Sequence, residues 1–266
     1  MDQPSFRLLD QVSLALERGN EAALTKARAH HFDGLGPLLE AWTLRHRFPG
    51  IASLLSQHEA PEMVEALGSA EEKPLRVVSG HRDTSRWGVL CFREATEPEW
   101  SAPLHLFQIE TQKVLRFRRK IARTKSMICG AIQEMVDNIF DHSGAPQTGA
   151  VVFSGTPEHV DIVVADAGKG ILASLQSNPT FAYLRDSGTA MQMALQDGNS
   201  RYGPALDRGY GFGTLFRALN SLDAGLRFRS GDHALEIAGR SPSLRSPHIS
   251  QKAELRGFVV TLRVAL

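Results

Sequence analysis

The chain has 266 residues, of which 42% are hydrophobic and 22% charged, and its formal net charge is +1. This length allows one large domain, or one complete domain with a smaller one before it. The near-neutral charge excludes a global field that would draw the chain to nucleic acid, membranes or acidic substrates. The sequence has two cysteines, no signal-peptide pattern and no apolar run of about 18 residues. These features predict a soluble, cytoplasmic protein without a membrane span.

Residues 1–102 are predicted to be mostly helical, with a few strands. Apolar residues recur at helical spacing from Phe6 to Leu16, and prolines interrupt the later apolar runs. Two short runs rich in β-branched and aromatic residues, 75–78 and 87–92, predict strands. The histidines of this region lack an accompanying cysteine or carboxylate framework, so surface or packing roles are predicted rather than metal binding. They are His30, His31, His46 and His58. No function is predicted for this region.

The remainder, residues 103–266, predicts an α/β domain that begins with helices. The segment 103–142 is helical in pattern, as two helices meeting near 122–126. Strands are expected at 150–153, 160–165, 226–229, 234–237 and 258–264, with 226–231 opening a hairpin. A tract rich in Gly, Ser and Asn, 174–208, separates them and holds one expected helix, 189–195. The basic stretch 116–125 resembles a nucleic-acid patch, but alternating cations on an exposed helix are usually solvated, so nucleic-acid binding is not predicted.

The first motif with chemical content is carried by one of these helices. Glu134, Asn138 and His142 are spaced four apart and therefore project from one helix face. The apolar residues Ile128, Ile132, Met135 and Ile139 form the opposite stripe, which would pack on a sheet. An amide oxygen can ligate Mg²⁺, and a carboxylate can deprotonate an attacking water. The alternative is a solvated polar face without chemistry.

The second motif follows a buried-looking strand. Asp166, Gly168 and Gly170 form a glycine-rich turn in which the carboxylate can accept from an adenine amino group. The run 168–173 also fits a dinucleotide-binding pattern, but no further βαβ unit or ribose-binding acid follows clearly. A phosphate-binding loop of the Walker A type is excluded, because Lys169 lacks the required glycine spacing and the following Ser or Thr.

The third motif is a loop with three alternating glycines before an apolar helical run. Such a loop exposes backbone N–H groups and, with the following helix start, forms an anion site. Arg208 stands where it can reach a phosphate, and the other nucleotide-binding residues predicted here are Gly209, Gly211, Gly213 and Thr214. The alternative is an ordinary flexible loop before a helix.

In this order, the three motifs resemble the GHKL superfamily of ATP-binding domains, which gyrase, a class of heat-shock chaperones, histidine kinases and MutL-type repair proteins share. The resemblance covers about residues 127–266. It implies a two-layer α/β sandwich with a Bergerat-type mixed, largely antiparallel sheet and helices on one face, preceded by the mostly helical region. It also implies that residues 174–208 form an ATP lid that orders with nucleotide.

The resemblance further implies roles for single residues. Asn138 would ligate Mg²⁺, Glu134 would be the general base, His142 would lie beside the phosphates, and Asp166 would bind adenine. The expected function is Mg²⁺-ATP binding, with ATP hydrolysis or protein-kinase activity on a partner in signalling. The alternative is an ATP-gated interaction module with little turnover. The expected partner is a regulator or phosphoacceptor protein, and a homodimer stays open.

The chain also departs from the pattern of this superfamily at several positions. Asp141 stands where many histidine kinases carry Lys, and the spacing from Asn138 to His142 is closer to the anti-sigma-factor serine kinases. Phe258 follows Gly257 where relatives often have Thr, which removes a hydroxyl from the adenine side. No phosphoacceptor-histidine motif precedes the domain, and His105 is predicted to be a partly buried structural residue.

Overall fold

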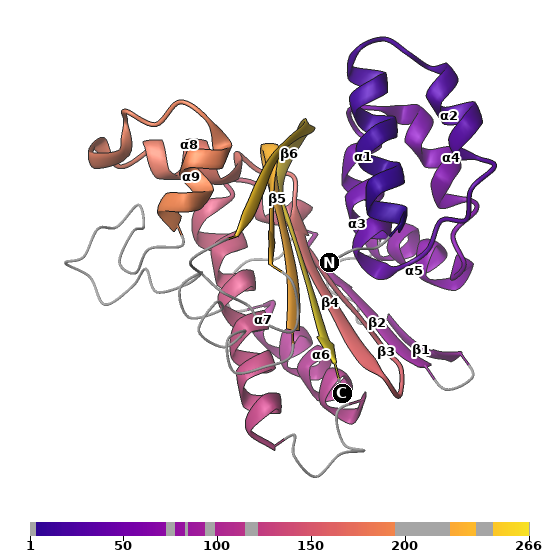
Figure 1. The fold of residues 1–266 in the computed structure, drawn as a ribbon. Helices are drawn as coiled ribbons and strands as arrows, with labels where there is room; N and C mark the ends of the chain where they lie inside the picture. Colours follow the sequence, from indigo (N-terminus) through magenta and orange to yellow (C-terminus); the bar gives the residue numbers. More distant parts are fainter. Residues whose placement is uncertain are drawn as a thin grey trace.

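The computed structural model describes residues 4–72, 78–82, 85–93, 99–114, 122–194, 224–237 and 247–265. Within these residues the protein is α/β, as predicted, with a six-stranded sheet in the order β1-β2-β3-β4-β6-β5 (Figure 1). The strands are β1 Val78–Arg82, β2 Ser85–Cys91, β3 Ala150–Gly155, β4 His159–Asp166, β5 Ala224–Ile237 and β6 His248–Ala265. Every pair of neighbouring strands is antiparallel, so the described sheet is not mixed.

The central strands are apolar at consecutive positions because both faces of the sheet are covered. In β3, Val151 and Phe153 belong to one hydrophobic core, and Val152 belongs to the other. Successive strand residues point to opposite faces, so each face receives every second side chain. A sheet buried on both sides therefore replaces the usual polar–apolar alternation with a continuous apolar run.

Four helices cover one face of the sheet: α6 Ser101–Val114, α7 Ala122–His142, α8 Gly170–Gln176 and α9 Ser187–Ala194 (Figure 1). The stripe predicted on α7 is confirmed, since its apolar side chains are buried in the core on this face. Phe140 at the end of α7 stacks on Trp100, with ring centroids 4.8 Å apart. The long α7 thus has one face in the core and leaves its polar face for other contacts.

The opposite face is covered by the N-terminal helices: α1 Pro4–Glu17, α2 Ala22–Ala27, α3 Leu35–Leu44, α4 Ala52–Leu55 and α5 Pro61–Glu72. Helix α3 packs against β4 and β6. Gly36 allows this approach, because a Cβ there would lie 2.4 Å from the ring of Phe6 and 2.7 Å from Cγ2 of Thr261. The described chain therefore has three layers, and helices are not confined to one face. The motifs concerned only one side of the sheet and carried no information about its other side.

The N-terminal layer is also joined to the sheet by a buried ion network. Arg227 and Arg229 alternate with apolar residues on β5, a pattern typical of a strand with one solvent face, yet both are at most 1% exposed. Arg227 Nε donates to Glu40 Oε1 at 2.7 Å, and its Nη2 donates to Asp10 Oδ1 at 2.6 Å. Arg229 Nη1 donates to Asp10 Oδ1 at 3.2 Å. Glu236 also accepts from Arg227. The acids come from α1, α3 and β5, so three elements are fixed together.

The charges of this network differ in how well they are compensated. Burial alone would lower the pKa of Arg227, but Glu40, Asp10 and Glu236 raise it above its usual value. Burial lowers the pKa of Arg229, because Glu40 and Asp10 offset only part of the desolvation and Arg227 adds repulsion. Arg227 therefore forms ion pairs with all three acidic residues and is the better compensated of the two arginines.

The largest differences from the predicted elements lie near glycines. The strands expected at 226–229 and 234–237 are parts of one long strand, β5. This strand pairs antiparallel with the next strand, β6, and its register shifts around Gly231. Gly231 has φ 56°, which bends the strand at a bulge instead of reversing it. Helix α8 begins at Gly170, where a turn was expected, and the helix expected at 189–195 begins earlier, as α9 at Ser187.

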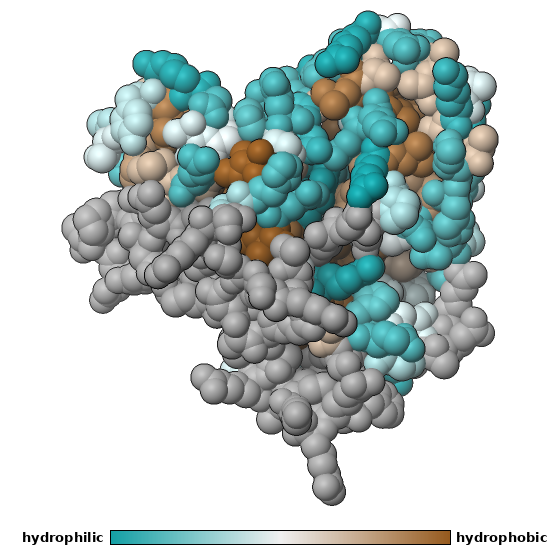
Figure 2. All heavy atoms as spheres, in the orientation of Figure 1, coloured by the Kyte–Doolittle hydropathy of each residue, from teal (hydrophilic) through white to brown (hydrophobic). Residues whose placement is uncertain are grey.

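Short 3₁₀ turns complete the described chain: η1 Pro49–Ile51, η3 Pro146–Thr148 and η4 Pro179–Phe181. None of the helices in the described ranges combines the length and apolar character needed to cross a membrane. In the view of Figure 2, hydrophilic and hydrophobic side chains intermingle on the surface of the N-terminal helices. The sheet combines β1 and β2 with strands that follow residue 102, so the predicted division at 102/103 runs through one sheet.

Candidate functional site

The polar face of α7 carries the three residues of the first motif. Glu134, Asn138 and His142 are all half-buried, and they span about 12 Å along the helix at 1.5 Å per residue. Burial raises the pKa of Glu134 above its usual value, and the nearby Asp137 and Asp141 add to the rise. A carboxyl group with a raised pKa is a stronger base once ionised, which suits proton abstraction near neutral pH.

Asn138 holds a buried polar atom that lacks a partner. Its Nδ2 has no hydrogen bond to any residue in the described part of the chain. A buried donor left unsatisfied costs about 1–3 kcal/mol. Because the amide oxygen and nitrogen exchange positions in a 180° flip, the site can present either a donor or an acceptor. This helix face thus has unused hydrogen-bonding capacity at the position predicted to ligate Mg²⁺.

Asp166 ends β4 with its carboxylate inside the protein. The residue is 2% exposed, and its Oδ1 accepts from Gly168 N at 2.6 Å. Its Oδ2 is buried and has no hydrogen-bond partner among the residues described. Burial raises the pKa of Asp166 to about 7, and the bond from Gly168 offsets only part of this effect. A carboxyl group so placed can bind a ligand that offers a donor to Oδ2.

The turn after Asp166 is fastened to the end of α7. Ser143, next to His142, accepts from Lys169 N at 2.9 Å through its backbone oxygen. A Cβ on Gly168 would lie 2.3 Å from that same oxygen, so only glycine permits the approach. The structure therefore brings the end of the first motif together with the second motif.

The same turn is also fastened to β5 and β6. Ser230 Oγ accepts from Ile171 N at 3.0 Å and donates to Gly257 O at 2.6 Å. Gly257 has φ 79°, and a Cβ there would lie 2.1 Å from Asp166 O. Ser230 is the residue that sequence reasoning missed here. Its hydroxyl lies beside Gly257, and both of its hydrogen bonds are made within the described chain.

The third motif cannot be placed. Arg208, Gly209, Gly211, Gly213 and Thr214 lie outside the described residues, as does the 195–208 part of the expected lid. The earlier part of that tract is well packed, because Leu175, Phe181, Leu184 and Met191 are buried in the core shared with α7. Residues 174–194 are thus packed against this core, and the expected ordering of the tract with nucleotide stays a prediction.

His105 was expected to be a partly buried structural histidine, and this is wrong. It lies on α6 with its side chain exposed. The neighbouring Leu104 and Phe107 are the residues of this turn that enter the core. Helical periodicity explains the difference, since His105 falls on the outward side.

Comparisons of the chain with models of protein families, with curated proteins and with solved structures find no match.

Proposed function

We propose that the part of the chain built around α7 and β4 binds Mg²⁺-ATP. One observation carries the proposal: Asn138 and Asp166 each hold a buried polar atom without a partner in the described chain. Both belong to segments that meet at Ser143. Buried polar groups are normally hydrogen-bonded, so two buried groups that lack partners in the described chain and lie in adjoining segments are suited to bind a ligand. The order of the three motifs supports a nucleotide as that ligand.

The chemistry of each group suits a part of Mg²⁺-ATP. Oδ2 of Asp166 would accept from the adenine amino group, while the Asn138 amide oxygen would ligate Mg²⁺ beside the phosphates. His142 would lie near the phosphates, together with Arg208 and the glycine loop 209–213. Mg²⁺, when bound, would neutralise developing charge on the phosphates. Guanine would place a carbonyl against Oδ2, so GTP is disfavoured by the cost of unpaired polar groups.

Turnover is proposed to depend on Glu134. Its raised pKa and half-buried position one turn before Asn138 suit a base that orients or deprotonates a water or a hydroxyl. The product would be free phosphate, or a phosphorylated serine or threonine on a partner protein acting in signalling.

A gated interaction module is the second candidate, and one feature favours it. Helices α8 and α9 pack on β5, and the other face of β5 carries the arginines that hold α1 and α3. A nucleotide-driven shift near α8 would therefore reach the N-terminal layer through a single strand.

Calorimetry with ATP and Mg²⁺ tests binding. The wild-type chain should bind, and ligand at 100 times its dissociation constant should stabilise the fold by about 2.7 kcal/mol. Asn138→Ala should abolish Mg²⁺-dependent binding, whereas Gln147→Ala, an exposed residue of η3, should not. Absence of binding by the wild-type chain would refute the proposal.

Two further variants separate recognition from chemistry. ATP should bind at least about tenfold more tightly than GTP, given about 1–3 kcal/mol for an unpaired polar group, and Asp166→Ala should weaken ATP binding. Glu134→Ala should keep ATP affinity but lose about 10²- to 10⁴-fold in turnover. With γ-labelled ATP, label in free phosphate indicates an ATPase, label on a co-purified protein indicates a kinase, and neither indicates the gated module.

A further inference from the structure

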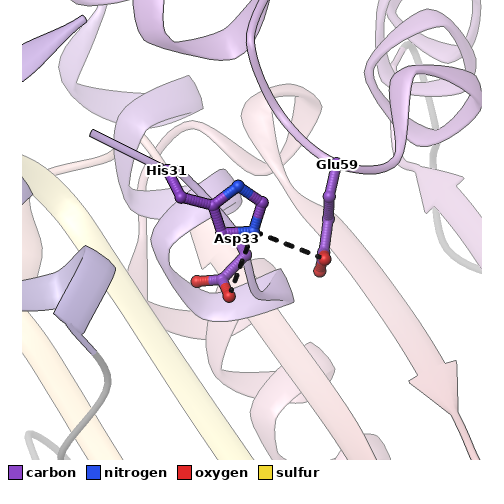
Figure 3. Close-up of side chains that lie close together, drawn as sticks. All are labelled: His31, Asp33 and Glu59. Atoms are coloured by element: carbon purple, nitrogen blue, oxygen red, sulfur yellow. Dashed lines mark ion pairs between the residues drawn. The ribbon is translucent and has the colours of Figure 1, made fainter. Parts of the chain in front are cut away.

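A second cluster of side chains with metal-binding chemistry lies in the N-terminal layer, away from the proposed nucleotide site. His31 Nε2 is 3.6 Å from Asp33 Oδ2 and 3.9 Å from Glu59 Oε2 (Figure 3). Each residue offers one atom that could ligate a metal ion, and these three atoms lie within 4.8 Å of one another. The sequence predicted no carboxylate framework around His31, and this was wrong, because Glu59 is distant in sequence and adjacent in space.

Backbone pairing explains why these side chains converge. Phe32 and His58 form an isolated parallel β-bridge, and their rings are buried in a T-shaped contact with centroids 5.8 Å apart. Neighbours of a bridged residue point to the opposite side of an extended backbone. His31, Asp33 and Glu59 are those neighbours, and they are exposed or half-buried. The bridge therefore places the three side chains on one outward side.

The buried ring of His58 stabilises this arrangement and is not itself a ligand. Its Nδ1 accepts from Ala60 N at 3.1 Å, which leaves the proton on Nε2 for Gly34 O at 3.3 Å. Burial lowers the pKa of His58, although Gly34 and Glu59 partly oppose this effect. Through these two hydrogen bonds, His58 joins the segments that carry the outward residues.

Each carboxylate of the cluster is oriented by a hydrogen bond to its other oxygen. Asp33 Oδ1 accepts from Ser5 Oγ at 2.6 Å, and Glu59 Oε1 accepts from Gly34 N at 3.4 Å. The remaining oxygens, Oδ2 and Oε2, are those nearest His31. Such outer hydrogen bonds are the usual means by which proteins orient metal ligands.

We propose that His31, Asp33 and Glu59 bind a divalent transition-metal ion of the zinc type. Bonds of about 2.0–2.2 Å at tetrahedral angles separate ligand atoms by about 3.4 Å. The distances of 3.6 and 3.9 Å from His31 Nε2 require only a small closure, and the two carboxylate oxygens lie within 4.8 Å of each other. An imidazole with two carboxylates suits zinc, whereas Mg²⁺ and Ca²⁺ prefer oxygen ligands alone.

The proposed ion has room for a further ligand. Asp33 and Glu59 also line a pocket of about 630 Å³ between the N-terminal helices and the sheet, to which Trp87, Asp161 and Arg263 contribute. Three protein ligands leave a fourth tetrahedral position open, as in zinc sites that hold water or a small molecule. The fourth position of the proposed ion would therefore be open to water or a small ligand.

Zinc titration of the full chain, purified without a histidine tag and stripped with a chelator, tests this site. Competition against a chromophoric chelator should show one tight equivalent of Zn²⁺. His31→Ala and Glu59→Gln should each lower the Zn²⁺ affinity at least about tenfold. Loss of a hydrogen bond to a metal ligand already lowers metal affinity by about that factor, and loss of a ligand should lower it at least as much. The matched control is His30→Ala, an adjacent exposed histidine whose loss should change nothing.

Further measurements distinguish Zn²⁺ binding at this cluster from binding elsewhere on the chain. Co²⁺ should give a tetrahedral visible spectrum that His31→Ala removes, while Mg²⁺ in excess should not displace Zn²⁺. No tight equivalent in the wild-type chain, or equal losses in His30→Ala and His31→Ala, overturns the proposal. Glu59→Gln should retain Mg²⁺-ATP binding if the nucleotide proposal holds, so failure of either proposal is visible without the other.

Discussion

Two buried ionisable side chains, one on each side of the sheet, differ in whether the described chain supplies all their partners. On the N-terminal face, Arg227 is fully enclosed and meets carboxylates of Asp10, Glu40 and Glu236. Beside the α7 face, Asp166 is just as buried, yet its Oδ2 has no partner within the described residues. Burial therefore does not distinguish a structural group from a binding group. The distinction lies in whether the protein itself supplies the partner.

The largest effect is expected from removing one partner of the N-terminal network. Glu40→Ala leaves Arg227 and Arg229 buried with less compensation, and breaking a buried pair costs about 3–5 kcal/mol. Urea unfolding monitored by circular dichroism measures the loss. The control is Glu254→Ala, which removes an exposed partner of Arg47 and should cost less than about 1 kcal/mol. Equal losses in the two variants would show that the network does not hold the N-terminal layer.

The Asp166 carboxyl group predicts a pH dependence on the other side of the sheet. Its folded pKa of about 7 lies above its ordinary value of 3.8, so the folded state binds the proton more tightly. The contribution of the protonated Asp166 to the free energy of unfolding is therefore fully present below about pH 4. It decreases between about pH 4 and 7 and is lost above about pH 7. The shift corresponds to at most about 4 kcal/mol, at about 1.4 kcal/mol per unit.

Asp166→Asn should remove this part of the pH dependence, because the amide does not titrate. Urea unfolding of both chains at several pH values from 4 to 8 measures the difference between them. Parallel curves across that range would show that the pKa of Asp166 is not raised in the folded protein.

A third variant tests the packing around Asp166. Gly257→Ala introduces a Cβ that overlaps Asp166 O, at φ 79°, whereas Gly144 has φ 70° with open space around it. Gly144→Ala should cost about 1–2 kcal/mol from backbone strain alone. Gly257→Ala should cost about 1–3 kcal/mol more because of the overlap. Thermal and urea unfolding compare the two, and similar losses would argue against close contact between β6 and the Asp166 turn.

The smallest effect is expected at a residue of the N-terminal face that, unlike Arg227, holds a buried polar atom without a partner among the residues described. Thr261 lies on the N-terminal face beside Gly36, and its Oγ1 is buried without a partner in the described part of the chain. Replacing an unsatisfied hydroxyl with a methyl group removes a desolvation cost, so Thr261→Val should be neutral or stabilise by up to about 1 kcal/mol. A loss of stability above about 1 kcal/mol would show that this hydroxyl is bonded after all, and differential scanning calorimetry resolves the two outcomes.

The helices and strands were predicted best from the sequence where an apolar pattern is compatible with only one type of secondary structure. The apolar stripe of α7 and the strands β3 and β4 follow directly from spacing and β-branched content. The separation of 226–229 and 234–237 into two strands was wrong, because a glycine in a strand produces either a turn or a bulge. Pairing with β6 along both halves of β5 selected the bulge at Gly231.

By itself, the sequence determined the α/β class and the order of the motif residues on α7 and after β4. These depend on neighbours along the chain, where backbone geometry translates spacing into direction. Only the tertiary structure decided that the N-terminal helices cover the second face of the sheet and that Arg227 is buried against Glu40. It also decided that Glu59 meets His31, since a β-bridge joins segments far apart in sequence. Burial and charge pairing are properties of surfaces in contact, and no local pattern specifies which surfaces will meet.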